Sequence, residues 1–283
     1  MKTEDLIENV FLSTNDFSVT GEDFQLLYNE ELEMLVTHPQ PQSLDRYYAS
    51  EDYISHTDSS RGLVNFLYQR IKKHNLQRKV KMIESFANGN KTLLDVGAGT
   101  GDFLVAAKES GWTVKGVEPN PTAKQRAAEK GIELETGLQS LQANTYQIIT
   151  LWHVLEHLPN LDKQIKSLSS HLEDSGILIV AVPNFKSFDA KFYKRYWAAF
   201  DVPRHLWHFS RTSIEKLFMN HSLKVVQTNP MVFDAFYVSL LSEKYKSGKQ
   251  SFVKGFLVGL WSNIRAWGNK EYSSIVYVLQ KRH

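Results

Sequence analysis

The chain has 283 residues, of which 33 are Lys or Arg, 31 are Asp or Glu and none is Cys. The absence of cysteine excludes disulfides, thiolate zinc sites and a cysteine nucleophile, and it favours a reducing compartment. A formal net charge of +2 makes no electrostatic case for a protein dedicated to nucleic acid or anionic membranes. Any contact with a polyanion would therefore have to be local.

The sequence predicts a cytoplasmic protein without stable membrane insertion. Residues Met1 to Asp5 are not a basic segment followed by an apolar run, as a secretory signal would be. The longest apolar stretches are interrupted well before the roughly 18 residues that a membrane-spanning helix requires.

The first 90 residues differ from the rest of the sequence. Gly62 to Phe86 has a helical pattern, whereas the half before it mixes turns with tyrosines. The sequence therefore predicts an N-terminal extension with a helical flap over residues 1–90, followed by a domain over residues 91–283.

From about Lys91 onward, short β-rich runs alternate with helical patterns, one of which begins at Asn120-Pro121. This alternation predicts an α/β fold with a doubly wound, mostly parallel sheet of seven strands. The stretch from 183 to about 270, rich in aromatics and His, is expected to be a substrate cap inserted around strand six. The seven runs are Thr92 to Val96, Thr113 to Glu118, Ile132 to Thr136, Tyr146 to Trp152, Ile177 to Val182, Lys224 to Thr228 and Ser274 to Leu279.

The sharpest motif is a glycine loop after the first of these runs. Gly97, Gly99 and Gly101 join a strand to a helix whose first backbone N–H groups are unpaired. Glycines there permit positive φ and let a ligand approach the backbone. A dinucleotide fingerprint would have its third glycine at Asp102, whose carboxylate would lie beside the pyrophosphate. Together with Asp95, this favours a cationic or zwitterionic ligand over a diphosphate.

A carboxylate ends the second predicted strand. Glu118 follows the glycine loop by about 20 residues, where a side chain can accept hydrogen bonds from both hydroxyls of a ribose. The alternative role for Glu118 is a solvated side chain at the end of a strand.

The segment Asp95 to Gly101, Glu118 and the segment Trp152 to His157 together resemble the class I S-adenosylmethionine-dependent methyltransferases. The sequence is most similar to the bacterial group that includes the ubiquinone-biosynthesis O-methyltransferases. The resemblance implies a Rossmann-like fold and S-adenosylmethionine as cofactor. It places the glycines at the methionine part, Asp95 at the ammonium group and Glu118 at the ribose. The cofactor-binding residues that it implies are Asp95, Gly97, Gly99, Gly101, Glu118, Pro119, Gly137 and Leu138 beside the adenine, and Trp152 and His153 flanking the cofactor.

His153, Glu156 and His157 also match the H-x-x-E-H string of some zinc proteases. That motif needs both His on one helix face, but here the string runs into Pro159, so that only a short turn fits. Some quinone-modifying relatives hold a divalent metal with a carboxylate where this chain has His153. A neutral imidazole there removes a negative charge and disfavours Mg²⁺, so no metal is expected.

The segment Asp201 to Ser210 follows the fifth strand, and the resemblance implies that it faces the methyl acceptor. His205 is the first candidate for a general base, because an imidazole with a pKa near about 6.5 can take a hydroxyl proton at neutral pH. Arg204, His157 and Glu156 are further candidates beside the acceptor, although Glu156 and His157 could instead only brace their turn. The alternative for His205 is a structural loop in which it hydrogen-bonds the backbone, as would His208.

Two further segments have candidate roles. Tyr47 to His56 resembles the flap that relatives fold over the cofactor, which adds Tyr53 and His56 to the cofactor-binding candidates, with simple packing as the alternative. An apolar stripe near the C-terminus is expected to be core or a homodimer face; a membrane-surface helix is the alternative, since lysines lie nearby. The stripe is Phe252, Phe256, Leu257, Leu260, Trp261 and Ile264.

The predicted function is methyl transfer from S-adenosylmethionine to a small-molecule acceptor, at a hydroxyl oxygen. A nicotinamide-dependent oxidoreductase is the first alternative, but it leaves Asp95 and Asp102 against the phosphates. A protein that binds S-adenosylmethionine without turnover is the second. The identity of the acceptor is not encoded in any pattern of this sequence.

Overall fold

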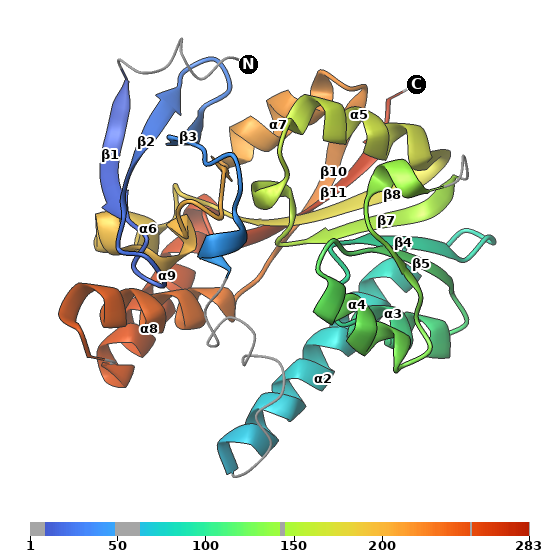
Figure 1. Cartoon of the computed structure of the whole chain (residues 1–283), viewed down its shortest axis with the longest axis horizontal. Coiled ribbons are helices and arrows are strands. Elements are labelled where there is room, and N and C mark those ends of the chain that lie inside the picture. The colour runs from blue at the N-terminus through green and yellow to red at the C-terminus, as the bar shows by residue number, and fades with distance from the viewer. Residues whose placement is uncertain (1–8, 49–62, 142–144, 250, 283) are drawn as a thin grey trace.

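A seven-stranded sheet with helices on both faces lies at the centre of the computed structural model, which describes residues 9–48, 63–141, 145–249 and 251–282 (Figure 1). The strand order is β10-β11-β8-β7-β4-β5-β6. Neighbours from β8 to β6 pair in parallel, whereas β11 is antiparallel to both β8 and β10. The strands are β4 (Thr92–Val96), β5 (Thr113–Val117), β6 (Leu134–Glu135), β7 (Tyr146–Trp152), β8 (Leu172–Pro183), β10 (Leu223–Pro230) and β11 (Ser274–Lys281).

All seven predicted strands are present in this sheet, so the predicted fold class is confirmed. The chain runs from β4 outward to β6 and then returns to β7 on the other side of β4, which makes the gap between β4 and β7 the point where the direction of winding reverses. In sheets of this kind, ligands bind at the carboxyl ends of the strands beside that point. β6 is shorter than its predicted run.

Both faces of the sheet are covered, which is why apolar residues on its central strands point to both faces rather than alternating with exposed polar ones. Leu94 and Ile149 belong to one core cluster and Leu93 and Ile148 to the other. The helix predicted at Asn120-Pro121 is present, with the Asn120 side chain accepting a hydrogen bond from Ala123 N at 3.1 Å. The helices are α2 (Leu63–Glu84), α3 (Asp102–Glu109), α4 (Pro121–Ala128), α5 (Leu161–His171), α6 (Phe188–Tyr193), α7 (Arg211–Met219), α8 (Asp234–Ser247) and α9 (Phe252–Asn269).

The N-terminal extension is only partly helical. Its second half contains α2, as predicted, but its first half forms an antiparallel sheet of β1 (Val10–Asn15), β2 (Asp23–Asn29) and β3 (Met34–His38), which β9 (Trp207–His208) completes. The sequence indicated turns and tyrosines in this half and did not predict its strands. The sheet forms because Phe24 and other inward side chains of β2 are buried, whereas Asp23 and Gln25 are exposed.

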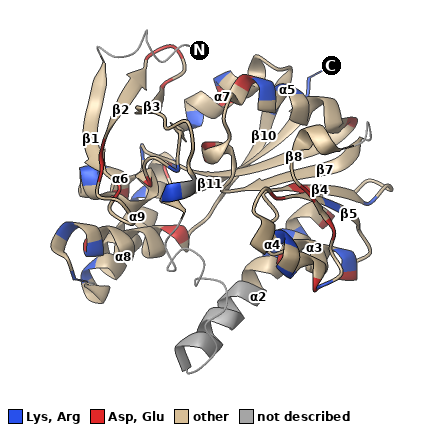
Figure 2. Ribbon diagram, in the orientation of Figure 1, with Lys and Arg blue, Asp and Glu red and all other residues tan. Residues whose placement is uncertain are grey.

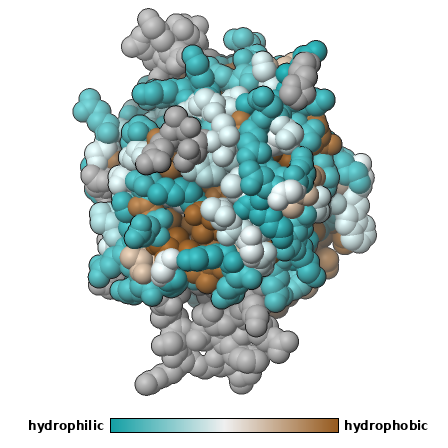
Figure 3. Space-filling view, turned by 90° about the vertical axis from the view of Figure 1, so that its right-hand side faces the viewer, coloured by the Kyte–Doolittle hydropathy of each residue, from teal (hydrophilic) through white to brown (hydrophobic). Residues whose placement is uncertain are grey.

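The segment predicted as a cap contains α6, β9, α7, β10, α8 and α9. Figure 1 shows α6, α8 and α9 on the same side of the molecule as β1 and β2, away from α3 and α4. Acidic and basic side chains are interspersed over the elements (Figure 2), and the face in Figure 3 is mostly hydrophilic and includes an apolar patch. None of the described helices is both long and apolar enough to cross a membrane.

A buried carboxylate attaches α9 to the rest of this region. Asp189 of α6 is fully buried and accepts hydrogen bonds from three donors. These are Trp197 Nε1 at 2.7 Å, Ser262 Oγ of α9 at 2.6 Å and Ser273 Oγ, just before β11, at 2.7 Å. A charged acceptor with three donors stabilises the arrangement, because each donor would otherwise be buried without a partner.

We expect Asp189→Ala to lower the free energy of unfolding by about 3 kcal/mol or more, because three buried donors lose their acceptor. Urea denaturation measures the change. Asp174→Ala is the matched control, because this carboxylate is 89% exposed and forms a surface ion pair with Lys281, and its loss should cost less than about 0.5 kcal/mol. Equal effects of the two substitutions would contradict the role given to Asp189.

Candidate functional site

The glycine loop lies at the carboxyl end of β4 and requires glycine for two reasons. Gly97, Gly99 and Gly101 have φ of +74°, +53° and +76°, the left-handed region that other residues rarely adopt. A Cβ added to Gly97 would also lie 2.3 Å from a methyl group of Val154. The loop is held by the carbonyl of Val117 at the end of β5, which accepts hydrogen bonds from the backbone N–H of Gly97 at 2.8 Å and of Ala98 at 2.9 Å.

Glu118 lies directly against this loop. Its Oε2 accepts a hydrogen bond from Gly99 N and its Oε1 from Asn120 N, both at 2.9 Å. Pro119 is exposed beside it. Because each carboxylate oxygen has two lone pairs, both oxygens of Glu118 can still accept a further hydrogen bond from a ligand.

Asp95 is buried below the loop, at the end of β4. It accepts a hydrogen bond from Thr150 Oγ1 at 2.6 Å. Burial raises the pKa of Asp95 to about 6, although the hydrogen bond from Thr150 and the positive charge of Lys79 oppose the shift. A cationic ligand placed here would favour the charged carboxylate.

Lys79 of α2 brings a positive charge to the same place, and sequence reasoning missed it. Its Nζ lies 4.4 Å from the ring centroid of Trp152 and 5.8 Å from that of Phe103. Burial lowers the pKa of Lys79 despite the nearby carboxylates of Asp95 and Asp234. Neither Lys79 nor Asp234 belongs to a sequence motif, so no local signal could have identified them.

Trp152 ends β7 and His153 follows it at the carboxyl edge of the sheet, as predicted. Trp152 packs edge-on against Phe103, with ring centroids 5.9 Å apart, and its buried Nε1 has no hydrogen-bond partner among the described residues. His153 has a left-handed backbone with φ of +58°, a conformation that is costly for a residue with a Cβ and is often found at functional sites.

His153 lies between two carboxylates. Its Nε2 is 3.1 Å from Asp234 Oδ2 at the start of α8, and its Nδ1 is 3.5 Å from Glu156 Oε1. Burial alone would lower the pKa of His153, but the hydrogen bond and charge of Asp234, followed by those of Glu156, raise it to about 10. The imidazole is therefore protonated at neutral pH, not neutral as the sequence analysis assumed. A positive charge disfavours a metal at His153 even more than a neutral ring does.

Gly137 and Leu138 begin the short helix η3 (Leu138–Ser140). The side chain of Leu138 belongs to the main core cluster, which leaves only its backbone to border a ligand. Glu135 is paired with Lys115 at 2.7 Å. The adenine contact of Gly137 and Leu138 stays a prediction.

Three candidate acceptor-side residues, Glu156, His157 and His205, converge on one cluster. Glu156 and His157 lie on the short helix η4 (Leu155–His157), and His205 comes from the segment after β8. The two imidazole rings meet edge-on with centroids 4.6 Å apart. One ligand atom from each of the three side chains lies within 4.8 Å of the other two.

Backbone carbonyls orient both imidazoles. His157 Nδ1 is 3.0 Å from the carbonyl of Arg204, and His205 Nδ1 is 2.9 Å from the carbonyl of Ala199. Because a carbonyl only accepts, each Nδ1 must be the N–H donor, and each Nε2 has a free lone pair whenever the ring is neutral. Burial, followed by the charge of His205, lowers the pKa of His157 to about 4, so His157 is neutral at physiological pH.

Glu156 is 1% exposed, and its carboxylate has only a long contact of 3.5 Å with His153 Nδ1 and no donor at ordinary hydrogen-bond geometry among the described residues. Burial alone would raise the pKa of Glu156, but His153, with smaller contributions from His205 and His157, lowers it. The carboxylate is therefore charged. A carboxylate and two imidazoles whose second nitrogens are held by carbonyls form a donor set that suits a divalent transition metal. The expectation that the protein binds no metal stays a prediction. A metal bound at this cluster would contradict it.

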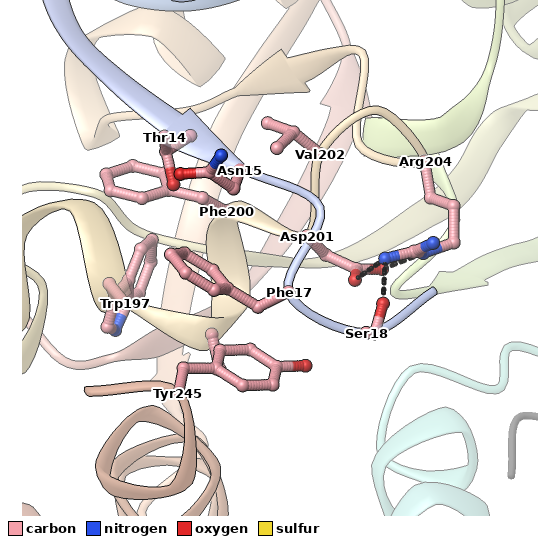
Figure 4. A pocket seen from close by; sticks show the side chains of 11 residues that line it. Thr14, Asn15, Phe17, Ser18, Trp197, Phe200, Asp201, Val202, Arg204 and Tyr245 are labelled. Atoms are coloured by element: carbon pink, nitrogen blue, oxygen red, sulfur yellow. Dashed lines mark hydrogen bonds and ion pairs between the residues drawn. The ribbon is translucent and has the colours of Figure 1, made fainter. Parts of the chain in front are cut away.

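Arg204, predicted to lie beside the acceptor, is buried in a network of hydrogen bonds. It is 1% exposed and holds the N-terminal sheet to the segment after β8. Its Nη2 donates to Asp16 Oδ1 at 2.9 Å, to Asp201 Oδ1 at 2.6 Å and to Ser18 Oγ, and its Nη1 donates to the carbonyl of Tyr47 at 2.8 Å. Figure 4 shows its guanidinium turned toward Asp201 and Ser18. These contacts give Arg204 a structural role that joins three segments, and its prediction as a residue beside the acceptor stays untested.

The remaining candidates divide into two groups. His208 is buried in β9 with its Nε2 3.0 Å from Thr37 Oγ1, which is the structural role weighed for it. Tyr53 and His56 lie outside the described residues.

A family model described as a methyltransferase domain matches residues 68–228. The chain belongs to this methyltransferase family. The predicted family and fold are thus confirmed, and the match contains the glycine loop, Glu118 and the cluster of Glu156, His157 and His205.

Curated relatives are similar over the same region. The ubiquinone biosynthesis O-methyltransferase of Haemophilus ducreyi is 31% identical over 118 residues, which is 36% of this chain and 50% of that protein. That of Actinobacillus pleuropneumoniae is 29% identical over 122 residues, 38% of this chain and 52% of the relative. The chain thus spans about half the length of the curated relatives that it matches.

Solved structures share the fold. The magnesium protoporphyrin IX methyltransferase of Synechocystis PCC 6803 with bound SAH superposes with a TM-score of 0.56 at 14% identity, covering 86% of this chain and 100% of that one. A cyclopropane synthase of Mycobacterium tuberculosis gives 0.51 at 10% identity, covering 72% of this chain and 83% of the other. At these identities the likeness shows the fold alone.

We expect the positive charge of His153 to stabilise the fold at neutral pH. At high pH the imidazole loses its proton, and this stabilisation disappears. Its folded pKa of about 10 lies above its ordinary value of 6.5. Its contribution is therefore fully present below pH 6.5 and is lost as the pH rises toward 10. His153→Gln should flatten the fall of the free energy of unfolding across this range.

Urea denaturation at a series of pH values measures the slope for each protein. His74→Gln, at an exposed position on α2, is the control and should keep the wild-type slope. The same slope in His153→Gln as in the wild type would show that His153 is not protonated between Asp234 and Glu156.

Proposed function

We propose that the chain transfers the methyl group of S-adenosylmethionine to a hydroxyl oxygen of a small-molecule acceptor. The single observation that supports this most is the glycine loop held against Glu118 by the hydrogen bond from Gly99 N, in a chain of the methyltransferase family. We place the reaction in the cytoplasm, in keeping with a chain that has no cysteine.

The cofactor would lie along the carboxyl ends of β4, β5 and β7. Glu118 would accept hydrogen bonds from the ribose hydroxyls, the loop glycines would let the methionine part approach the backbone, and Asp95 would face its ammonium group. S-Adenosylmethionine, when bound, supplies a methyl group on a positively charged sulfur, activated for displacement. The carboxylates of Asp95 and Glu118 favour such a cation.

The same charges disfavour the nicotinamide alternative. Asp102 is the first residue of α3, where the unpaired N–H groups of a dinucleotide-binding fold would meet the pyrophosphate. Its carboxylate accepts hydrogen bonds from Thr100 Oγ1 at 3.1 Å and Lys130 Nζ at 2.8 Å, which hold it at this helix end. A second carboxylate, Asp95, lies behind the loop. Two negative charges would repel a diphosphate.

His205 is the base that we propose for the acceptor hydroxyl. Its Nδ1 donates to Ala199 O, so Nε2 can take a proton, and Glu156 is close enough to stabilise the resulting imidazolium. His157 is the weaker candidate, because its pKa of about 4 makes it a poor base at neutral pH. As the hydroxyl proton moves to His205 Nε2, the acceptor oxygen forms the new C–O bond while the C–S bond breaks, and the electron pair stays on sulfur.

We expect Glu118→Ala to weaken S-adenosylmethionine binding by about tenfold to a hundredfold, since two hydrogen bonds from the ribose to a charged acceptor are lost. Isothermal titration calorimetry measures the dissociation constant. Glu135→Ala is the matched control, because this carboxylate pairs with Lys115 and should not affect affinity. An unchanged affinity of Glu118→Ala would remove the ribose assignment, and binding of NAD by the wild type would favour the oxidoreductase.

We expect His205→Ala to lower turnover by about 10²-fold or more while leaving S-adenosylmethionine affinity unchanged, because the base acts on the acceptor only. Release of S-adenosylhomocysteine is measured with a panel of catechols and hydroxylated sugars. His171→Ala, at the end of α5, is the matched control. A wild-type rate in His205→Ala would remove it as the base, and binding without turnover on any acceptor would favour the non-catalytic alternative.

A further inference from the structure

α9 has its large apolar side chains on the outside of the molecule. Of the two roles expected for this stripe, the core role is wrong, because its members, with Val253 and Trp267, are between 37% and 73% exposed, and the role as a homodimer face is untested. The inward face of α9 is instead made of small and polar residues. These buried residues are Gly255, Val258, Gly259, Ser262, Asn263 and Ala266.

The contacts of the inward face fix α9 in this orientation. A Cβ on Gly255 would lie 2.9 Å from Leu240 Cα of α8, and one on Gly259 would lie 2.8 Å from Ala235 O, so the two backbones touch. Glycines four residues apart allow the same close approach between helices in membranes. Ser262 donates to Asp189, and Asn263 Nδ2 donates to Val232 O at 2.9 Å. A rotation of α9 that buried the apolar side chains would break all of these contacts.

α8 extends the exposed apolar surface. Phe233, just before α8, and Tyr237 are 49% and 57% exposed, and Phe236 stacks on Phe256 of α9 with ring centroids 5.1 Å apart. We refer to these three side chains together with the exposed apolar residues of α9 as the α8–α9 face. A continuous surface of this kind is uncommon on a protein that has no partner to cover it.

Within residues 233–270, which contain both helices, every exposed charged side chain is basic. The two acidic residues in this range are each paired with a basic side chain. Asp234 pairs with His153 at 3.1 Å, and buried Glu243 pairs with Lys254 at 3.0 Å. Figure 2 shows basic residues on α8. The exposed basic residues are Lys244, Lys246, Lys249, Lys254, Arg265 and Lys270.

We propose that the α8–α9 face docks on the surface of an anionic lipid bilayer. Exposed Phe, Leu and Trp side chains beside lysines are the combination that lets a helix lie in the interface, with the rings among the acyl chains and the ammonium groups at the headgroups. Each lysine near such a surface is attracted to the anionic lipid. The helices lie on the bilayer and do not span it, in keeping with their length and hydrophobicity.

A second copy of the chain fits the same face less well. A two-fold dimer formed through the α8–α9 face would bring the basic residues of one copy close to those of the other. Like charges brought together at an interface oppose association, whereas anionic headgroups neutralise them. The proposal does not depend on the methyl-transfer reaction.

Vesicle binding of the full chain tests the proposal. We expect sedimentation with phosphatidylcholine vesicles in which about a third of the lipid is phosphatidylglycerol, little binding to pure phosphatidylcholine, and release at high salt as the lysine charges are screened. Replacing Trp261 and Trp267 together by Asn should weaken the partition by about tenfold or more, because two buried aromatic side chains are lost from the interface. Circular dichroism and urea denaturation show that the variant still folds.

Met219→Asn is the matched control, because Met219 of α7 is 57% exposed but lies outside the α8–α9 face. It should bind vesicles as the wild type does. Absence of binding to anionic vesicles, or equal binding by the tryptophan variant and the wild type, would overturn the proposal. So would a dimer in sedimentation velocity that the tryptophan substitutions dissociate, since the face would then belong to a second copy.

Discussion

One protonated imidazole connects the parts of the molecule that the candidate site requires. His153 at the end of β7 lies between Glu156, which belongs to the acceptor-side cluster, and Asp234, which begins α8. Glu156 is buried with only the long contact from His153 Nδ1 among the described residues, so it needs that positive charge to remain ionised. The charge of His153 therefore keeps Glu156 ionised. The contact of His153 with Asp234 also fixes the start of α8 relative to the candidate site.

A second buried charge, Arg204, has the same role on the other side of the site. It ties Asp16 in the N-terminal sheet to Asp201 in the segment that leads to His205. Removing one member of such a network is costly, because the charges that remain are buried and unpaired. The segment that carries His205 is thus attached to the N-terminal part of the chain. This explains how the base that we propose can be held rigidly on an irregular segment outside the central sheet.

The sequence predicted those features that are encoded locally. The seven strands follow from short apolar runs, and the glycine loop and Glu118 follow from spacing within one β–α–β unit. It missed β1, β2 and β3 although they pair as local hairpins, and it could not predict that β9, more than 150 residues further along the chain, extends their sheet. For the same reason Arg204 looked like a free basic side chain, and Lys79 and Asp234 could not be connected to the site. Their roles depend on contacts between distant segments, which no local pattern records.

The apolar stripe of α9 shows a different limit. Helical spacing correctly grouped its side chains on one face, but periodicity does not say which face of a helix is buried. Here the choice was made by Gly255 and Gly259, which allow contact between backbones, and by Ser262, which donates to Asp189. A formal net charge of +2 for the whole chain likewise conceals the basic character of this surface, because the acids that balance it lie elsewhere or are buried. Average charge therefore argues against a dedicated polyanion-binding protein but not against one local surface that binds anionic lipid.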